Sequence, residues 1–450
     1  MRFIPNNETV QRQMLQELGL SSIDELFRSI PPKARLGRPL NIPPGMAEEE
    51  QLALFEALAA KNSGAECSAF LGGGSYSHFI PLAADALVQR GEFLTAYTPY
   101  QPEVSQGTLQ SIFEFQTFIT LLSGMEVANA SVYDGASATA EAVLMADRLQ
   151  QGRGRVLLAA SLHPYYRQVI DTYTSNLGLT LEDVPPDGKS GRIDGAALKD
   201  MLGEDVACVV VQQPNFFGVV EAIEGVASAA KGVGALLVTA VTEALSMALL
   251  EPPGASGADI VAGEAQSFGV PTYFGGPYLG FMASKDAHMR QLPGRIAGQT
   301  VDAEGRRGFV LTLATREQHI RREKATSNIC TNQNLVMMGA LIYLTLMGRE
   351  GLKEVAAQNV SALAYFMEQL RTLPGYEALY NGPNFNEVLL GCPRPAGEIV
   401  AACQARRIVP GIDMGRFDNA RARQLLVAVT ETAHKADIDA LLAALREAGA

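Results

Sequence analysis

Four short apolar segments, separated by stretches with helical spacing, constrain most strongly what this 450-residue chain can fold into. They read RVLLAA, CVVVQQ, ALLVTAV and ADIVAG and occupy residues 155–160, 208–213, 235–241 and 258–263. Helical patterns precede them, as in SIFEFQTFITLLSG and ATAEAVLMADRLQQG. Buried strands that alternate with helices are typical of a mainly parallel sheet covered on both faces, so we predict an α/β fold.

A ligand site in such a sheet lies beyond the carboxyl ends of the strands. This rule directs attention to the loops after Ala160, Gln213, Val241 and Gly263. The loop after Ala160 contains His163, Tyr165 and Tyr166, which fit either an aromatic wall that stacks on a planar ligand or an ordinary helix start.

The remaining chain suggests three parts. Residues 1–85 read as a helical arm, interrupted by PPKARLGRPLNIPPGM with its five prolines, and its weak core suggests that it wraps another surface. Residues 86–325 hold the sheet. Residues 326–450 open with the apolar helix NLVMMGALIYLTLMG and alternate helices with the weaker strands EVLLGC and QLLVAVT, which predicts a smaller α/β domain.

Composition limits the partners. A net charge of −12 and a pI near 5.1 argue against nucleic acid and anionic membranes as partners, since both require clustered positive charge. Five dispersed cysteines without CxxC spacing predict neither a disulfide framework nor a metal site. No segment has the pattern of a signal peptide or a membrane span, so we expect a cytoplasmic protein.

Two further segments have the pattern of a cofactor site. VYDGASATAEAVLMA, residues 132–146, opens a helix with small residues, so its free N–H groups fit a phosphate, although Ser137 and Thr139 fit simple helix caps equally well. GADIVAGEAQSFGVPTYFGGPYLGF, residues 257–281, is a strand that ends in polar residues before a glycine-rich loop. In a pyridoxal-phosphate (PLP) enzyme of this layout, one strand end supplies an aspartate to the ring nitrogen and the next supplies a Schiff-base lysine. Neither residue is present.

Three long segments together resemble one family closely. They are AYTPYQPEVSQGTLQSIFEFQTFITLLSGMEVANASVYDGASATAEA, ADIVAGEAQSFGVPTYFGGPYLGF and QHIRREKATSNICTNQ, and the arm adds SSIDELF and FLGGGSYSHFIP. The chain is similar to the glycine decarboxylase P-protein of the glycine cleavage system, in particular to the first subunit of its two-subunit bacterial form. The resemblance implies an aminotransferase-like fold of fold-type I with PLP as cofactor. It also implies decarboxylation of glycine, with transfer of the aminomethyl group to the lipoyl arm of the H-protein.

The resemblance assigns the Schiff-base lysine to subunit 2 and makes this chain its degenerate copy. Val241 stands at the position of the ring-nitrogen aspartate, and Gln266-Ser267 stand at the position of the histidine-lysine pair. We therefore expect no covalently bound PLP, no catalytic residue within this chain alone and an inactive isolated chain. Lys324 is the one lysine near a family motif, and its charged surroundings favour a surface role.

The surviving motifs are then expected to serve a site on the partner subunit. We predict that a phosphate loop acting in trans comprises Gly275, Gly276, Thr326, Ser327 and Asn328. We predict that the lining of the partner's site comprises Ser75, Tyr76, His78, Tyr97, Thr98, Tyr100, Gln101 and Glu103. The alternative is that these residues only pack the subunits together.

Two other functions stay open at this point. The chain fits a structural or regulatory pseudoenzyme that stabilises subunit 2 or docks the H-protein without contributing to the site. A separate PLP enzyme that binds its cofactor non-covalently is disfavoured, since both the aspartate and the lysine are missing.

Overall fold

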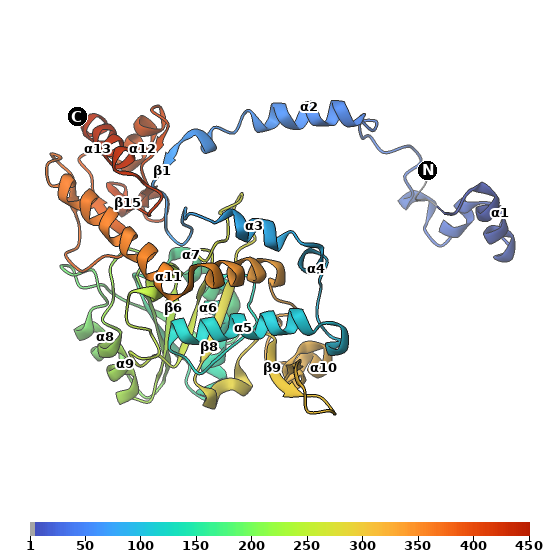
Figure 1. Ribbon diagram of the computed structural model, residues 1–450, viewed down its shortest axis with the longest axis horizontal. Helices are drawn as coiled ribbons and strands as arrows, with labels where there is room; N and C mark the ends of the chain where they lie inside the picture. The colour runs from blue at the N-terminus through green and yellow to red at the C-terminus, as the bar shows by residue number, and fades with distance from the viewer. Residues whose placement is uncertain (1–4) are drawn as a thin grey trace. The chain divides into compact units, whose positions relative to one another are not determined.

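A seven-stranded sheet forms the centre of the fold in this computed structural model, which describes residues 5–450 (Figure 1). The spatial order is β2-β8-β7-β6-β5-β3-β4. Strands β7, β6, β5, β3 and β4 run parallel, β8 runs antiparallel to β7, and β2 runs antiparallel to β8. The strands are β2 Val127–Ala128, β3 Arg155–Ala159, β4 Thr180–Val184, β5 Val206–Gln212, β6 Leu236–Val241, β7 Ile260–Glu264 and β8 Gly280–Ser284. The predicted mainly parallel sheet is confirmed.

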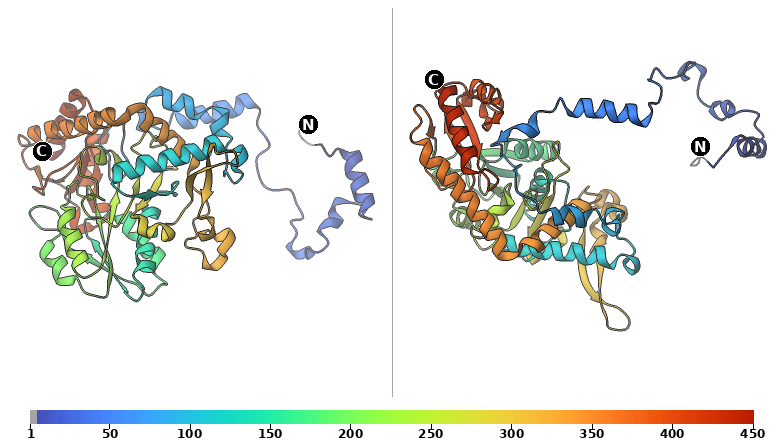
Figure 2. Two further views of the ribbon diagram at one scale, coloured as in Figure 1. Left: turned by 60° about the horizontal axis from the view of Figure 1, so that its bottom comes forward. Right: turned by 45° about the horizontal axis from the view of Figure 1, so that its top comes forward.

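Both faces of this sheet are covered by helices. In β5, Val209 and Val211 join a core cluster with side chains of α5 and α11, whereas Cys208 and Val210 join a second cluster with α6 and α7. Successive residues of a strand point to opposite faces, so a strand buried throughout requires a layer on each side. Figure 2 shows the sheet between these two helical layers. The covering helices are α5 Gln106–Ser123, α6 Gly135–Leu149, α7 Pro164–Thr174, α8 Gly195–Met201 and α9 Ile223–Gly232.

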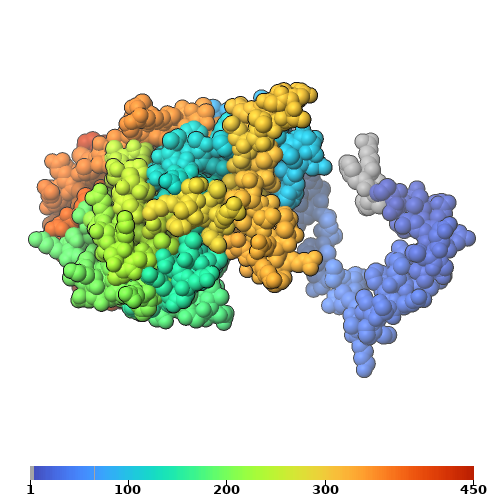
Figure 3. Space-filling model, turned by 90° about the horizontal axis from the view of Figure 1, so that it is seen from below, coloured from blue at the N-terminus to red at the C-terminus, as the bar shows by residue number. Residues whose placement is uncertain are grey.

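The sequence patterns did not predict the edge strand β4 or the hairpin of β9 and β10. The edge strand β4 is only partly buried, so it lacks the continuous apolar run of its neighbours. The hairpin of β9 Ile296–Val301 and β10 Arg307–Thr312 projects from the rest of the larger unit, and most of its residues are exposed or half-buried (Figures 2 and 3). An exposed strand shows little alternation of apolar and polar residues, because neither of its faces is buried in a core.

The C-terminal part contains the predicted smaller α/β layer. Its four-stranded antiparallel sheet has the order β11-β12-β15-β14 and includes the two strands expected from EVLLGC and QLLVAVT. The strands are β11 Glu377–Ala378, β12 Glu387–Gly391, β14 Ile412–Asp413 and β15 Gln424–Ala428. Helices α12 Ala396–Gln404 and α13 Lys435–Gly449 pack on this sheet around a separate core cluster.

The long helix α11, Asn334–Leu370, connects the two sheets and bends at Gly348, where φ is 59° and ψ is −175°. Among the described helices it alone is long and apolar enough, by length and composition, to cross a membrane. Its buried side chains Met337, Leu341 and Leu344 lie in the same core cluster as α5, so α11 acts here as a core helix.

The chain divides into two compact units, Met1–Ala65 and Glu66–Ala450. The first contains α1 Glu8–Glu17 and α2 Glu48–Ala59, and Asn7 caps α1 by accepting hydrogen bonds from Thr9 N and Val10 N at 3.1 Å. The expected helix in SSIDELFRSI is a 3-10 turn, Ile23–Phe27. Met1–Ile4 of the expected arm lie outside the described residues, and none of residues 5–64 is buried.

Residues 66–85, which the sequence-based division assigns to the arm, belong to the second unit. There β1 Ser68–Ala69 pairs in parallel with β13 Ile408–Val409, and Phe70 and Tyr76 are buried. The chain continues through α3 Leu82–Val88 and α4 Gly91–Leu94, and α10 Gln318–Arg321 precedes α11. The three-part division at 1–85, 86–325 and 326–450 stays a prediction.

Candidate functional site

A cavity of about 530 Å³ lies at the carboxyl ends of the parallel strands, where the loops after β3, β5 and β7 meet. We call it the strand-end cavity. It is lined by Gly72, Gly73, Gly74, Ser75, Tyr133, Asp134, Ala136, His163, Tyr165, Tyr166, Phe216, Glu264, Gly275, Gly276, Pro277, Tyr278, Gln333, Ile412, Arg416 and Phe417. Of the residues predicted to serve a partner's site, it contains Ser75, Gly275 and Gly276. The Ser75 hydroxyl lies 2.7 Å from the Tyr278 hydroxyl.

Aromatic rings form one wall of this cavity. His163 lies with its ring centroid 4.7 Å from that of Phe216 and 5.1 Å from that of Tyr166. Its Nδ1 accepts a hydrogen bond from Tyr165 N at 3.1 Å, so Nε2 carries the proton and donates to the Gly73 carbonyl at 2.7 Å. Burial lowers the pKa of His163 to about 4. The imidazole is therefore a neutral flat surface rather than an acid or base.

Two acidic side chains, Glu264 and Asp134, also line the cavity. Glu264, at the end of β7, accepts a hydrogen bond from Gly135 N at 3.0 Å with one oxygen. Its other oxygen accepts from Leu279 N at 2.8 Å and from Gln266 N at 3.1 Å. Burial raises the pKa of Glu264 to about 7, and the nearby Asp134 charge acts in the same direction.

Asp134 is the N-cap of α6, since its Oδ1 accepts a hydrogen bond from Ser137 N at 2.7 Å. Ser137 and Thr139, which fitted caps by sequence, do not have that role. The Thr139 hydroxyl instead donates to the Gly135 carbonyl at 2.8 Å within the helix. The start of α6, which the sequence suggested as a phosphate site, is thus occupied by two acidic side chains of this chain.

The positions that hold PLP in an enzyme of this layout carry residues in this chain that do not fit that cofactor. The Gln266 amide is buried, where Nε2 donates to the Tyr76 and Val270 carbonyls and Oε1 accepts from Tyr76 N at 2.9 Å. The Ser267 hydroxyl is buried without a hydrogen-bond partner among residues 5–450, and Val241 lies in the apolar core. The residues that line the strand-end cavity include no lysine, and Lys324 is exposed on the turn Arg322–Lys324.

The segment of residues 72–79, which we call the strap, connects the two sheets of the second unit. The Tyr76 hydroxyl donates to Glu387 Oε2 at 2.8 Å, and Gly73 N donates to Glu387 Oε1 at 2.6 Å. Burial raises the pKa of Glu387 to about 7. The side chain of Tyr76 therefore faces the interior of this chain, so its predicted lining role has no exposed group to support it.

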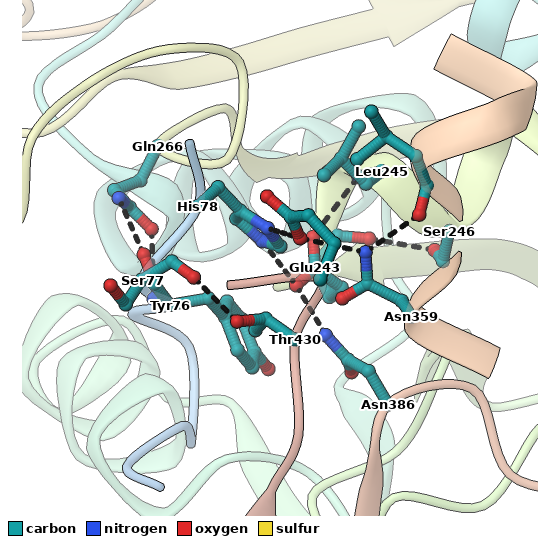
Figure 4. A network of polar contacts seen from close by, with 12 residues as sticks. Tyr76, Ser77, His78, Glu243, Leu245, Ser246, Gln266, Asn359, Asn386 and Thr430 are labelled. Atoms are coloured by element: carbon teal, nitrogen blue, oxygen red, sulfur yellow. Dashed lines mark hydrogen bonds and ion pairs between the residues drawn. The ribbon is translucent and has the colours of Figure 1, made fainter. Parts of the chain in front are cut away.

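His78 lies at the centre of a buried polar network (Figure 4). Its Nδ1 is 2.8 Å from Glu431 Oε2 and its Nε2 is 3.1 Å from Glu243 Oε2, and 2% of the His78 side chain is exposed. Burial alone would lower the pKa of His78, but Glu243 and Glu431 together raise it to about 10. His78 is thus an imidazolium held between two carboxylates of its own chain, and its predicted lining role likewise lacks an exposed group.

Arg295 brings two of the predicted segments together. The buried guanidinium donates to the Tyr100 hydroxyl at 3.1 Å, to the Cys330 carbonyl at 2.8 Å and to Thr331 Oγ1 at 3.1 Å. The loop around Tyr100 and the segment that follows Thr326–Asn328 therefore share one arginine. A second cavity of about 380 Å³ adjoins Tyr100 and Cys330.

The other predicted residues lie apart from the strand-end cavity. Tyr97 is 83% exposed, Gln101 and Glu103 are exposed, and Thr98 is half-buried. In the other predicted segment Asn328 is exposed while Thr326 and Ser327 are half-buried, and Ser327 Oγ accepts from Ile329 N at 3.0 Å. None of these described side chains lines the strand-end cavity.

Sequence reasoning missed the residues that control the buried polar contacts: Asp134, Glu243, Arg295, Glu387 and Glu431. For Asp134 a signal was present, since aspartate immediately before a helical run is a common N-cap. The others could not be found in this way, because the partners described above lie 35 or more positions away in the chain.

The fold and this arrangement of strand ends define the class: a fold-type I PLP-dependent transferase-like protein. A sphingosine-1-phosphate lyase from Burkholderia pseudomallei superimposes on 93% of this chain and 94% of its own, with a TM-score of 0.66 at 16% identity, which supports the fold alone. A glycine decarboxylase (P-protein) of the glycine cleavage system in inhibitor-bound form superimposes with a TM-score of 0.90 at 44% identity and covers 100% of both chains.

The family model described as glycine cleavage system P-protein matches residues 1–445. A probable glycine dehydrogenase (decarboxylating) subunit 1 from Koribacter versatilis is 47% identical over 440 residues, which cover 98% of each chain. The chain belongs to the glycine cleavage system P-protein family, and its similarity is to subunit 1.

Proposed function

We propose that this chain is the subunit of a heteromeric glycine decarboxylase that completes the active site of subunit 2 without holding PLP itself. Three features support this proposal. The family match covers the chain, the Gln266 and Ser267 side chains offer no amine for a Schiff base, and the start of α6 is occupied by Asp134 and Glu264. In the assembled enzyme PLP supplies an electron sink for decarboxylation of glycine, and it would reside on subunit 2.

One observation carries the proposal furthest: large apolar side chains are exposed on the glycine-rich loop and along residues 79–104. Phe274 is 95% exposed, Leu82 85%, Tyr97 83% and Val104 76%. Residues of α3, of the loop at 269–277 and of the start of α11 line one common cavity of about 210 Å³, so these segments are neighbours. We call the exposed side chains of residues 79–104 with Tyr273 and Phe274 the apolar face. Patches of this kind mark protein interfaces.

Subunit 2 is the partner that this face is proposed to bind. Gly275 and Gly276 follow Phe274 directly, so an interface there would bring the glycine-rich loop toward the partner's cofactor. Residues 5–64, of which none is buried, would add contacts to the same partner. The lipoylated H-protein is proposed as the acceptor of the aminomethyl group, and the cytoplasm as the location.

Reconstitution tests this function. The purified chain is expected to catalyse no glycine–CO2 exchange, and activity is expected when subunit 2 and H-protein are added. Phe274→Ser should weaken co-purification with subunit 2 at least about tenfold, since exposed aromatic anchors dominate interface energy. Leu177→Ser, at a residue 54% exposed after α7, is the matched control and should co-purify normally. Exchange by the chain alone would refute the proposal.

The structural alternative predicts a different result for Tyr97, whose side chain makes no hydrogen bond in the described structure. If the site is shared, Tyr97→Ala should lower the exchange rate about tenfold or more in an intact complex, with kcat affected. Tyr173→Ala, a 37% exposed tyrosine of α7, is the control. An intact Tyr97→Ala complex with unchanged kcat and KM would favour a subunit that only stabilises its partner.

A further inference from the structure

Acidic side chains occupy the strand-end cavity of this chain at the place where its fold would bind a phosphate group. A helix N-terminus holds a phosphate through free N–H groups and a positive dipole end. In α6 the Gly135 N–H already donates to Glu264, and the Ser137 N–H already donates to Asp134. A phosphate there would lose both donors and would meet two carboxylates. The fold keeps the cavity, but the acidic side chains at the start of α6 make it disfavour an anion and favour a positively charged group.

Space and walls for a planar molecule nevertheless remain. The cavity measures about 530 Å³, which lies within the range of small-molecule sites, roughly 300–1,000 Å³. The neutral His163 ring, with its proton fixed on Nε2, lies against Phe216 and Tyr166. Phe417 packs edge-on against Phe216 with ring centroids 5.6 Å apart. A flat ring fits this aromatic wall through stacking and apolar contact.

The charge inside the cavity favours a cation. Asp134 is half-buried and uses one oxygen for Ser137 N, and the structure records no hydrogen bond to its other oxygen among residues 5–450. Arg416 is the one cationic residue among the described lining residues. Arg416 is exposed, and its guanidinium lies 5.4 Å from the centroid of the Phe417 ring and 3.4 Å from the Tyr165 hydroxyl. Water screens its charge far more than that of the inner carboxylates.

We propose that the strand-end cavity binds a planar aromatic amine that carries no phosphate, with the ammonium group at Asp134 and the ring against His163 and Phe216. The ligand is held without a covalent bond. The inference goes beyond the proposed function, because it concerns this chain's own cavity and does not depend on which site subunit 2 contains.

Three related compounds test whether the cavity selects an ammonium group and whether it rejects a phosphate group. Calorimetric titration of the purified full chain is to be made with pyridoxamine, with pyridoxine and with pyridoxamine 5′-phosphate. Pyridoxine replaces the aminomethyl group by a hydroxymethyl group, and the third compound adds the phosphate. Pyridoxamine should bind, and each of the other two should bind about tenfold more weakly, because one lacks the ammonium and the other brings a dianion to two carboxylates.

Replacement of Asp134 by a neutral residue tests whether the ammonium group binds at this side chain. Asp134→Asn retains an N-cap, since asparagine caps helices about as well as aspartate, so the fold should persist. The affinity for pyridoxamine should fall about tenfold, while that for pyridoxine should not change. Asp194→Asn is the matched control: Asp194 caps α8 in the same way, through Ala196 N at 2.8 Å, and does not line the cavity. Its affinities should equal those of the unaltered chain.

Two results would overturn the inference. One is that pyridoxamine 5′-phosphate binds as tightly as pyridoxamine or more tightly, which would show an open phosphate site. The other is that pyridoxamine does not bind at millimolar concentration, or binds with an affinity that Asp134→Asn leaves unchanged. The comparison of the three compounds on the unaltered chain requires no variant, so a folding defect cannot obscure it.

Discussion

The buried pair of carboxylates around His78 makes a specific prediction about stability and pH. His78 lies 3.1 Å from Glu243 and 2.8 Å from Glu431, and the three side chains are 2%, 1% and 7% exposed. Replacement by glutamine removes the positive charge and leaves two buried carboxylates without it. Loss of one partner from a buried ion pair costs about 3–5 kcal/mol, so His78→Gln should lower the free energy of unfolding by that amount near pH 6.5.

The unfolding free energy that His78→Gln removes should become smaller as the pH rises. The pKa of His78 is raised from 6.5 to about 10 in the folded chain. A group whose folded pKa is raised contributes all of its stability below the unfolded pKa and loses it as the pH passes through the folded pKa. Between pH 6.5 and 9.5 the contribution of His78 to stability should therefore fall, by an upper limit of about 4 kcal/mol at 1.36 kcal/mol per pH unit. The His78→Gln variant has no side chain at position 78 that titrates in this pH range.

Urea unfolding followed by far-UV circular dichroism at pH 6.5, 8.0 and 9.5 measures the effect. The difference in unfolding free energy between the unaltered chain and His78→Gln should be largest at pH 6.5 and smallest at pH 9.5. His288→Gln, on the turn Asp286–Gln291 and without a side-chain hydrogen bond among the described residues, controls for general effects of losing a histidine. A difference that is the same at all three pH values would refute the ion-pair reasoning.

Three other perturbations test the hydrogen bond of the strap, the packing at the start of α6 and the contribution of the first unit to stability. Tyr76→Phe removes the hydrogen bond to Glu387 at 2.8 Å and should lower the free energy of unfolding by about 1–3 kcal/mol in urea titrations. Gly135→Ala places a methyl group against the Tyr166 hydroxyl and should cost about 1–3 kcal/mol by the same measurement. Removal of residues 1–65 should leave the urea midpoint of the second unit unchanged, since none of the described residues 5–64 is buried.

Gly135→Ala has a matched comparison within the chain. Gly107→Ala, in the first turn of α5, meets no atom within 4 Å and should be neutral or stabilising by a few tenths of a kcal/mol, about the usual effect of glycine replacement in a helix. Equal unfolding free energies for Gly107→Ala and Gly135→Ala would contradict the crowding at α6. A lower urea midpoint after truncation would mean that the first unit contributes to the core.

Sequence alone predicted the parts of this fold that leave a periodic apolar signal. The runs that became β3, β5, β6 and β7 are buried on both faces, so nearly every residue in them is apolar. Ligands bind at the carboxyl ends of parallel strands, and this rule predicted the edge of the sheet at which the cavity lies. Strand β4 and the hairpin β9–β10 escaped prediction, because exposure removes the pressure for apolar residues.

The sequence by itself also determined which chemical groups are missing, since an amide and a hydroxyl at Gln266 and Ser267 cannot form an imine wherever they lie. Only the tertiary structure decided what the remaining groups do. Glu264 reaches Gly135 across 129 positions of the chain, and His78 meets Glu243 and Glu431 across 165 and 353. Local propensity contains no information about such contacts. They arise when packing excludes water and forces each buried polar group to find a partner.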